Sequence, residues 1–501
     1  MTGISRFRWK RPAFLALTFS LLLSFSLVSL AFAAEQLTRI SIDPFTNPDS
    51  QHKTQVEPDT FAFGNTVVSA FQSGRFFNGG ASDIGWATST NGGQTWTHGF
   101  LPHATVNAPN PNPKYARASD PSVAYDARHK VWMISWLGIV DPVNGPVDVL
   151  VSRSTNGGLT WGNPVTVNAT GVFNDKNWTV CDDTSSSPFY GHCYTEFDNN
   201  SSLNRVQMST STNGGLTWGA AKTTPDQACV IGGQPLVQPN GTVIVPIDDC
   251  FETAILSFRS TDGGNTWSKT VLAAQILFDG DPGGIRSGPL PTAEIDKSGR
   301  VYVVWNDCRF EAGCSAPIGT NDLVLISSAD GVIWTVPKRI PADPVGSGVD
   351  HLIPGLAVDR STSGSSAHLG LAYYYFPNSN CTTSTCVLNV GFISSTNGGK
   401  SWSASEQLAG GMNLNWLANT SQGRMVGDYI STSIVPGDDD ATPVFEVAFP
   451  PTGGPSCALP PVVCHENTYT TSEDVLHLTG GTNVANDVAP SSPTKKSRLS
   501  V

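Results

Sequence analysis

Hydrophobic and polar residues alternate over short stretches along most of the chain. Residues 147–151, Val-Asp-Val-Leu-Val, are one such stretch, and a turn rich in Ser, Asn and Gly follows. A period of two is typical of a β-strand with one buried face, and short strands separated by turns predict β-hairpins. Only 14% of the 501 residues are charged, while Gly contributes 49 and Pro 35. Surface helices need more charge than this, so the pattern predicts an all-β protein.

One phrase recurs where the predicted hairpins turn. It reads Ser-Thr-Asn-Gly-Gly-Gln-Thr-Trp at residues 89–96, and a sixth copy, at 328–334, lacks one residue. The other copies end at Trp161, Trp218, Trp267 and Trp402. The Asn or Asp side chain can accept backbone N–H groups, and Gly can supply positive φ. Four of the five intact copies carry Asn, which argues against calcium binding or catalysis there and favours a structural turn.

The phrase resembles the Asp-box, or BNR, repeat of the sialidase-like β-propellers, whose family form is Ser-x-Asp-x-Gly-x-Thr-Trp. Successive copies begin 49 to 68 residues apart, which suits one four-stranded blade each. The resemblance implies a single propeller over residues 34–485.

A second recurring signal favours seven blades over six. Each unit begins with a small or acidic residue near a Pro or an apolar strand. The seven starts lie at Glu57, Asp120, Asp175, Gly233, Gly288, His351 and Gly427. The seventh unit has no phrase copy and no obvious fourth strand, and residues 37–43 can supply that strand. An N-terminal strand would then close the propeller and remove its sheet edges.

The two ends of the chain differ in composition from the middle. Residues 1–33 run from basic residues through an apolar stretch to Ala-Phe-Ala, the order of a cleaved secretory signal. An uncleaved membrane anchor is the alternative. Residues 486–501 are rich in Ser, Pro and Lys, which predicts a disordered tail. We therefore expect a secreted, extracellular protein with no membrane attachment after cleavage.

The ten cysteines fall into five close pairs along the chain. The pairs are Cys181 with Cys193, Cys229 with Cys250, Cys308 with Cys314, Cys381 with Cys386, and Cys457 with Cys464. Local disulfides formed in an oxidising compartment are the simplest interpretation, although spacing alone leaves the connectivity open. A zinc site is disfavoured, because no Cys-x-x-Cys pair occurs with matching histidines.

The formal net charge of −12 excludes a general binder of nucleic acid or of anionic membranes. We expect a monomer that binds a carbohydrate or glycoconjugate and needs no cofactor. The acids at 438–440 and at 182–183 could hold structural calcium, although exposed turn acids usually have no metal.

Charged residues gather at the unit starts and in mid-blade loops, which a propeller brings to one face. Arginine can hold a ligand carboxylate by two hydrogen bonds, and paired carboxyl groups can act at a glycosidic bond. The substrate-binding candidates are Arg309, Arg75, Arg117, Arg286, Arg424, Glu57 and Asp175. The catalytic candidates are Tyr429, Glu311 and Asp120. Other charged residues expected on this face include Asp59, Lys176, Asp248, Asp249, Asp307, Asp350, His351 and Asp428. Each acid also has an ordinary explanation as a turn residue.

The resemblance to sialidases extends only partly to these candidates. The first-blade motif Phe/Tyr-Arg-Ile-Pro is replaced by Gln-Val-Glu-Pro at 55–58, so its arginine is missing. The loop at 74–82 also lacks the expected general-acid Asp. Tyr429 lies seven residues before Pro436, as the nucleophilic Tyr does in the family, with Glu311 as its base and Arg309 as a carboxylate ligand.

The resemblance implies a glycan-active, exo-acting glycoside hydrolase, similar to an exo-α-sialidase, with an incomplete site. The missing residues keep a non-catalytic carbohydrate-binding or adhesion propeller open. Another glycosidase, a uronate lyase and a protein-interaction scaffold are further alternatives.

Overall fold

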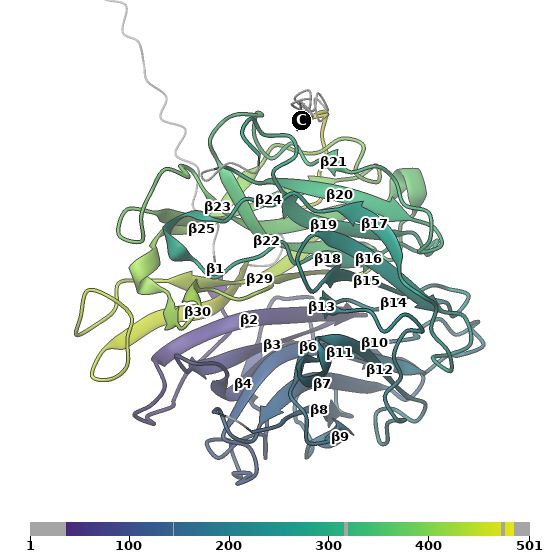
Figure 1. The fold of residues 1–501 in the computed structure, drawn as a ribbon, viewed down its shortest axis with the longest axis horizontal. Coiled ribbons are helices and arrows are strands. Elements are labelled where there is room, and N and C mark those ends of the chain that lie inside the picture. The colour runs from purple at the N-terminus through teal and green to yellow at the C-terminus, as the bar shows by residue number, and fades with distance from the viewer. Residues whose placement is uncertain (1–36, 144, 315–318, 472–475, 485–501) are drawn as a thin grey trace, which may run out of the picture. The chain divides into compact units, whose positions relative to one another are not determined.

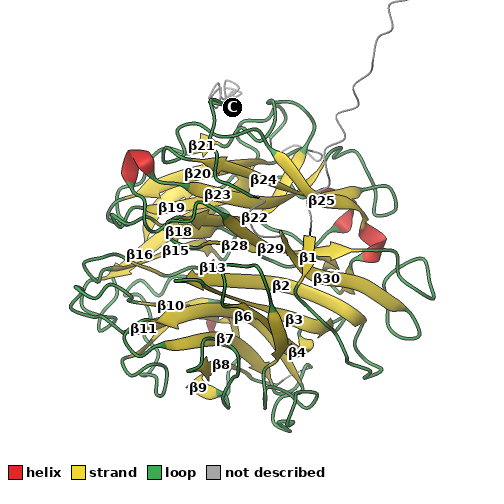
Figure 2. Ribbon diagram, turned by 180° about the vertical axis from the view of Figure 1, so that it is seen from behind, coloured by secondary structure: helices red, strands yellow, loops and turns green. Residues whose placement is uncertain are grey.

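The computed structural model describes residues 37–143, 145–314, 319–471 and 476–484, all within one compact unit, Glu35–Val501. The predicted signal peptide and tail lie outside the described residues. Strands dominate the described chain and confirm the all-β class (Figures 1 and 2). Its helical segments are the short 3-10 turns η1 (Asn200–Ser202), η2 (Pro282–Gly284), η3 (Gly364–Ser366) and η4 (Leu414–Trp416). Within these ranges no helix has the length and hydrophobicity of a membrane span.

The described strands belong to six sheets, of twelve, three, five, four, four and two strands. In chain order we group these consecutive strands into seven units. The first unit is β2 (His52–Phe63), β3 (Thr66–Arg75), β4 (Ala81–Ser89) and β5 (Thr97–Phe100). The second is β6 (Arg117–Asp126), β7 (Val131–Ile139), β8 (Val147–Ser154) and β9 (Val165–Asn168). The third is β10 (Asn174–Cys181), β11 (Cys193–Asn199) and β12 (Arg205–Ser211). The fourth is β13 (Val230–Gly233), β14 (Leu236–Val237), β15 (Val243–Asp249), β16 (Ala254–Ser260) and β17 (Val271–Gln275).

The remaining strands continue this order. The fifth unit is β18 (Thr292–Ile295), β19 (Val301–Asp307), β20 (Asp322–Ser328) and β21 (Lys338–Arg339). The sixth is β22 (Asp350–Val358), β23 (Leu369–Phe376), β24 (Val387–Ser395) and β25 (Glu406–Asn413). The small hairpin β26 (Ala418–Thr420) and β27 (Gly423–Met425) precedes the seventh unit, β28 (Ser431–Ile434), β29 (Ala441–Ala448) and β30 (Val463–Thr471). Strand β1 (Leu37–Arg39) pairs antiparallel with β30, so the N-terminal strand joins the last unit as the sequence predicts.

The first strands of the units contact one another in a closed series. Strand β2 contacts β6, β6 contacts β10, β10 contacts β13, and β14 contacts β18. Strand β18 then contacts β22, β22 contacts β28, and β28 contacts β2. Hydrophobic clusters lie between consecutive units, as where Val68 and Trp86 of the first unit pack with Trp132 and Trp136 of the second. The units therefore bury their faces against their neighbours.

The repeated phrase forms the turn after the third strand of its unit, as predicted. In the second unit the Ser154 hydroxyl accepts the amide N–H of Gly158 at 3.0 Å and donates to Asn156 Oδ1 at 2.9 Å. Asn156 Oδ1 also accepts the amide of Thr160 at 3.0 Å. Gly157 and Gly158 both have positive φ, at 80° and 79°. Residues 260–266 repeat these bonds with Asp262 in place of Asn.

All five predicted cysteine pairs form disulfides. They join Cys181 to Cys193, Cys229 to Cys250, Cys308 to Cys314, Cys381 to Cys386 and Cys457 to Cys464. Each bridge closes a short loop, and the set fits an oxidising compartment.

Candidate functional site

Three of the first strands carry β-bulges at charged residues that line one cavity. The pairing register shifts around Glu57 in β2, Asp120 in β6 and Lys176 in β10. These three residues have φ of 57°, 48° and 53°, in the left-handed region. A residue other than Gly costs roughly 1–2 kcal/mol there, and bulges often re-aim a side chain at a functional site. A bulge with the same backbone conformation thus carries a carboxyl group in β2 and in β6 and an amine in β10.

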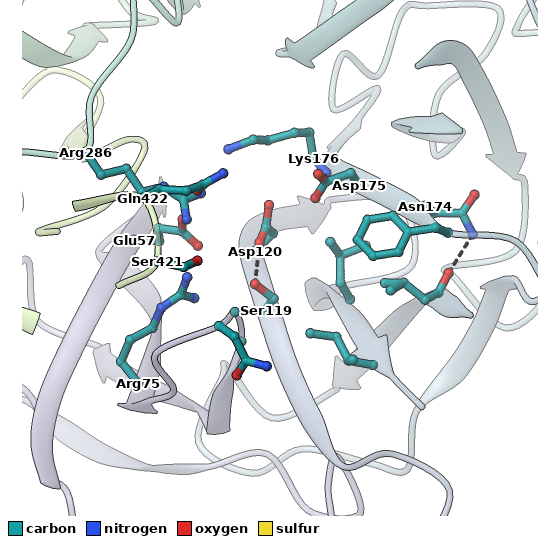
Figure 3. Close-up of a pocket in the computed structure, with 17 residues that line it drawn as sticks. Glu57, Arg75, Ser119, Asp120, Asn174, Asp175, Lys176, Arg286, Ser421 and Gln422 are labelled. Carbon is teal, nitrogen blue, oxygen red and sulfur yellow. Dashed lines mark hydrogen bonds between the residues drawn. The ribbon is translucent and has the colours of Figure 1, made fainter. Parts of the chain in front are cut away.

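These bulges border a cavity of about 200 Å³. Its charged lining residues are Glu57, Arg75, Asp120, Asp175, Lys176 and Arg286. Figure 3 shows these side chains arranged around one space, with Glu57 and Arg75 on one side of Asp120 and Asp175 and Lys176 on the other. The cavity is therefore lined by both acids and cations.

A chain of hydrogen bonds joins the two acids Glu57 and Asp120. Arg75 Nη1 donates to Gln72 Oε1 at 2.6 Å, and a guanidinium can only donate, which orients the Gln72 amide. Gln72 Nε2 then donates to Glu57 Oε2 and, at 3.1 Å, to the Ser119 hydroxyl. Ser119 in turn donates to Asp120 Oδ1 at 2.5 Å. Glu57 Oε1 and Asp120 Oδ2 take no part in this chain.

Burial and neighbouring charges separate the pKa values of the cavity acids. Burial, with the charges of Asp120 and Asp428 added, raises the pKa of Glu57 to about 8. Burial also raises the pKa of Asp175, to about 6. Burial acts in the same direction on Asp428, but Lys176 and Arg286 hold the pKa of that carboxyl well below its usual range. At neutral pH Glu57 is therefore a neutral acid, while Asp175 and Asp428 are ionised.

Three cations face these acids, and they differ in how far they are already paired. Arg286 holds Asp428 by two hydrogen bonds, from Nε at 2.7 Å and Nη2 at 2.5 Å, and Lys176 bonds to the same carboxylate. The Arg75 side chain is buried, and among the described residues its one side-chain hydrogen bond is that to Gln72. Arg75 Nε is enclosed without an acceptor. Because the bond to Gln72 uses Nη1 and Nε is enclosed, Nη2 is the donor that Arg75 can offer to an anionic group in the cavity.

Tyr429 lies beside the cavity and not with its predicted partner. It lines a small adjoining hollow together with Asp120 and Lys176. Its hydroxyl donates to the carbonyl of Pro121 at 2.9 Å, and burial together with the charge of Glu57 raises its pKa well above the usual value. Glu311 instead accepts the amide of Gly346 at 3.0 Å, so the structure does not bring Glu311 to Tyr429.

The predicted arginines divide into two groups. Arg75 and Arg286 line the cavity. Arg117 lies behind its wall, where Nη1 donates to Asn78 Oδ1 and to the Gly79 carbonyl, both at 2.7 Å.

The other two arginines are engaged elsewhere. Arg309 is bonded to Asp307, at 2.8 Å from its Nε, because only one residue separates them after β19. Arg424 donates to the carbonyls of Leu417 and Cys457 at 2.9 and 3.1 Å. Neither lines the cavity, so the structure does not bring these two to the site.

Sequence reasoning missed Gln72 and Ser119. Gln72 is a neutral amide in the middle of β3, 15 positions after the carboxyl that it binds. Ser119 directly precedes Asp120, but serine next to a turn acid is common. Their role becomes clear only in the fold, where β3 pairs with β2 and contacts β6.

Among the described residues, two clusters outside the cavity could hold a metal ion. Asp322, Asp343 and His351 form one, in which Arg339 already supplies positive charge to both aspartates. Asp359, His368 and Asp439 form the other, and Asp439 belongs to the acidic run considered above for calcium. Of the pair at 182–183, Asp182 accepts the amide of Thr184 and Asp183 that of Ala127. That pair is therefore bound to the backbone of neighbouring turns.

A scan against protein-family models and a search of curated proteins give no match. Among solved structures the chain is similar to a polysaccharide lyase of family PL25, an ulvan lyase, with 10% identity over 87% of this chain and 96% of that one and a TM-score of 0.49. It is also similar to a Hadza microbial sialidase, with 12% identity over 88% and 94% and a TM-score of 0.45. A third is the intramolecular trans-sialidase from Ruminococcus gnavus, with 13% identity over 87% and 98% and a TM-score of 0.42. At TM-scores below 0.5 these similarities assign no activity to the chain.

Proposed function

We propose that this protein is a seven-bladed, sialidase-like β-propeller that acts as a glycoside hydrolase on acidic glycans. The closed series of contacts among the first strands supports the propeller, and β1 completes its last blade. The six turns built on the repeated phrase are then its Asp-box repeats.

The hydrogen-bonded pair of Glu57 and Asp120 carries the proposal. Glu57 is protonated at neutral pH, and since Oε2 accepts from Gln72, the proton resides on Oε1. Glu57 acts as the general acid that protonates the glycosidic oxygen. Asp120, oriented by Ser119, supplies the second carboxyl group, which acts at the anomeric carbon. Glycosidic bond cleavage uses two such carboxyl groups.

The cations of the cavity indicate that the reacting sugar is acidic. Arg75 lines the cavity and can offer Nη2 as a donor, and Arg286 and Lys176 line the same space. A sialic acid or a uronic acid presents a carboxylate that a guanidinium can hold by two hydrogen bonds. An exo-acting sialidase is one member of this class.

The proposed setting is extracellular. A cleaved signal at residues 1–33 would deliver the chain to an oxidising compartment, where its five disulfides form.

The test is a panel of fluorogenic glycosides that includes a sialoside and several uronides, assayed with wild type, Glu57→Gln and Asp120→Asn. We expect turnover of at least one acidic glycoside and a fall in kcat of about 100-fold or more in each variant. Glu311→Gln is the matched control, because it removes a buried carboxyl outside the cavity, and its kcat should stay near that of wild type.

Two other outcomes would change the proposed function. A product with a new carbon–carbon double bond, seen by its ultraviolet absorbance after incubation with a uronic acid polysaccharide, would replace hydrolysis by a lyase reaction. Binding of acidic sugars that Arg75→Ala abolishes, without turnover of any substrate, would leave a carbohydrate-binding propeller.

A further inference from the structure

A second hollow of about 290 Å³ adjoins the charged cavity. The two share Asn78, Gly79, Ile139 and Phe173 in their linings. These shared residues lie in the β3–β4 loop, at the end of β7 and in the β9–β10 loop. A ligand seated in the cavity can therefore extend into the hollow without leaving the surface.

The two spaces differ sharply in charge. Six charged side chains line the cavity, whereas Asp141 is the one charged residue among the described residues that line the hollow. Asp141 Oδ1 is already bonded to the amide of Val143 at 2.8 Å. No cation lines the described part of the hollow, so nothing there compensates an anionic ligand group.

Phe173 presents an exposed ring on a firmly held backbone. Its side chain is 42% exposed, although its neighbour Asn174 is buried. The amide of Phe173 donates to the Ser201 hydroxyl at 2.9 Å, and its carbonyl accepts the amide of Asn200 at 2.9 Å. Because this backbone is already ordered, the protein loses little conformational entropy when a ligand packs on the ring.

The polar part of the shared wall is also held in place. Arg117 donates to Asn78 Oδ1 and to the Gly79 carbonyl, so the Asn78 Nδ2 group is the part of that amide left to donate to a ligand. One aromatic face and one amide donor match a sugar ring, which has an apolar face of C–H groups and hydroxyls around its edge.

We propose that this hollow is a second sugar subsite, which holds an uncharged sugar linked to the acidic sugar in the cavity. The substrate class is thus an acidic sugar joined to a neutral one, with Phe173 as the stacking platform. This inference rests on the proposed function, since it needs an acidic sugar in the cavity.

The test is titration calorimetry with named sugars. Sialyllactose and an aldobiouronic acid, a uronic acid linked to a neutral sugar, are compared with free sialic acid, free glucuronic acid and digalacturonic acid. We expect wild type to bind one acid–neutral probe about tenfold more tightly than its acidic monosaccharide and more tightly than digalacturonic acid. Phe173→Ala should remove this gain, measured as the ratio of disaccharide to monosaccharide affinity within the same variant, while Phe173→Tyr should keep it.

Phe63→Ala is the matched control, because Phe63 is also an exposed phenylalanine, at 39%, but lies at the far end of β2 from Glu57. Equal affinity for mono- and disaccharides, or an equal gain in Phe173→Ala, would overturn the subsite and leave the acidic cavity intact. A gain that depends on Phe173 without cleavage of any substrate would support the subsite and overturn the enzymatic proposal. No binding of any probe by wild type would overturn both.

Discussion

Arg286 and Asp428 form a two-point ion pair, with Nε to Oδ1 at 2.7 Å and Nη2 to Oδ2 at 2.5 Å. They are 142 positions apart in the chain, and Lys176 joins them from β10. One carboxylate thus anchors two cations from different units at the rim of the cavity. Its loss would leave two buried or half-buried positive charges without their partner.

We expect Asp428→Asn to lower the free energy of unfolding by about 3 kcal/mol at pH 7, because the charges of Lys176 and Arg286 lose their compensation. The pKa of Asp428 is depressed in the folded state, so its stabilisation is present above the ordinary carboxyl pKa of 3.8 and is lost as the pH falls below it. The difference between wild type and variant in urea unfolding should therefore shrink from pH 7 to pH 3. Asp438→Asn, at an exposed turn acid, is the control and should change neither value. A pH-independent difference would contradict this electrostatic explanation.

We expect Glu57→Gln to be less active but more stable than wild type at pH 8. Burial raises the pKa of Glu57 from 4.5 to about 8, so the folded state binds the proton more tightly than the unfolded state. The stability of wild type therefore falls as the pH rises from about 4.5 to 8, and the neutral amide avoids that loss. Thermal unfolding should show nearly equal stability at pH 4 and an advantage for the variant of roughly 2–4 kcal/mol at pH 8. A variant less stable than wild type at pH 8 would show that Glu57 is ionised and compensated in the fold.

We expect Tyr429→Phe to retain kcat within about threefold and to lose about 1–2 kcal/mol of stability. The hydroxyl donates to the buried Pro121 carbonyl, and its removal leaves that acceptor without its donor. Steady-state kinetics and urea unfolding of the same sample separate the two effects. Tyr375→Phe, which loses a hydroxyl bond to Gln407 at the exposed edge of the sixth unit, serves as the control. A fall in kcat above 100-fold with unchanged substrate binding would instead make Tyr429 the nucleophile that the sialidase resemblance implies.

The features that sequence analysis predicted correctly are local in the chain. The repeated turns depend on bonds that span four residues, as from Ser154 to Gly158, and the cysteine pairs close short loops. Glu57, Asp120 and Asp175 could be selected from the sequence for a related reason. Each of them stands at the start of a repeating unit. The repeat itself therefore predicts that their side chains share one centre.

The part of the site that sequence analysis could not predict depends on which units face each other across that centre. Glu311 and Tyr429 were paired by resemblance, but Glu311 lies in the loop after β19 and accepts the Gly346 amide there. Gln72 gave no signal, because its role comes from lying between Arg75, Glu57 and Ser119 in space. The role of a neutral residue that orients charged ones can be recognised only in the folded structure.

The turns of the repeated phrase should tolerate Asp in place of Asn but not Ala, with no effect on activity. Asp262 already makes, in the fourth unit, the bonds that Asn156 makes in the second. Asn156→Asp should therefore keep wild-type stability with or without added calcium, whereas Asn156→Ala should lose about 1 kcal/mol, because the Thr160 amide loses its acceptor. The turn follows β8 at Ser154, while Val147, at the other end of that strand, lines the cavity, roughly 20 Å away for a strand of this length. Thermal unfolding with calcium or with a chelator, together with kcat/KM at 25 °C, checks both statements. A calcium-dependent rise in Tm for Asn156→Asp would show that the turn is a metal site after all, and a fall in kcat/KM for either variant would show that the turn reaches the active centre.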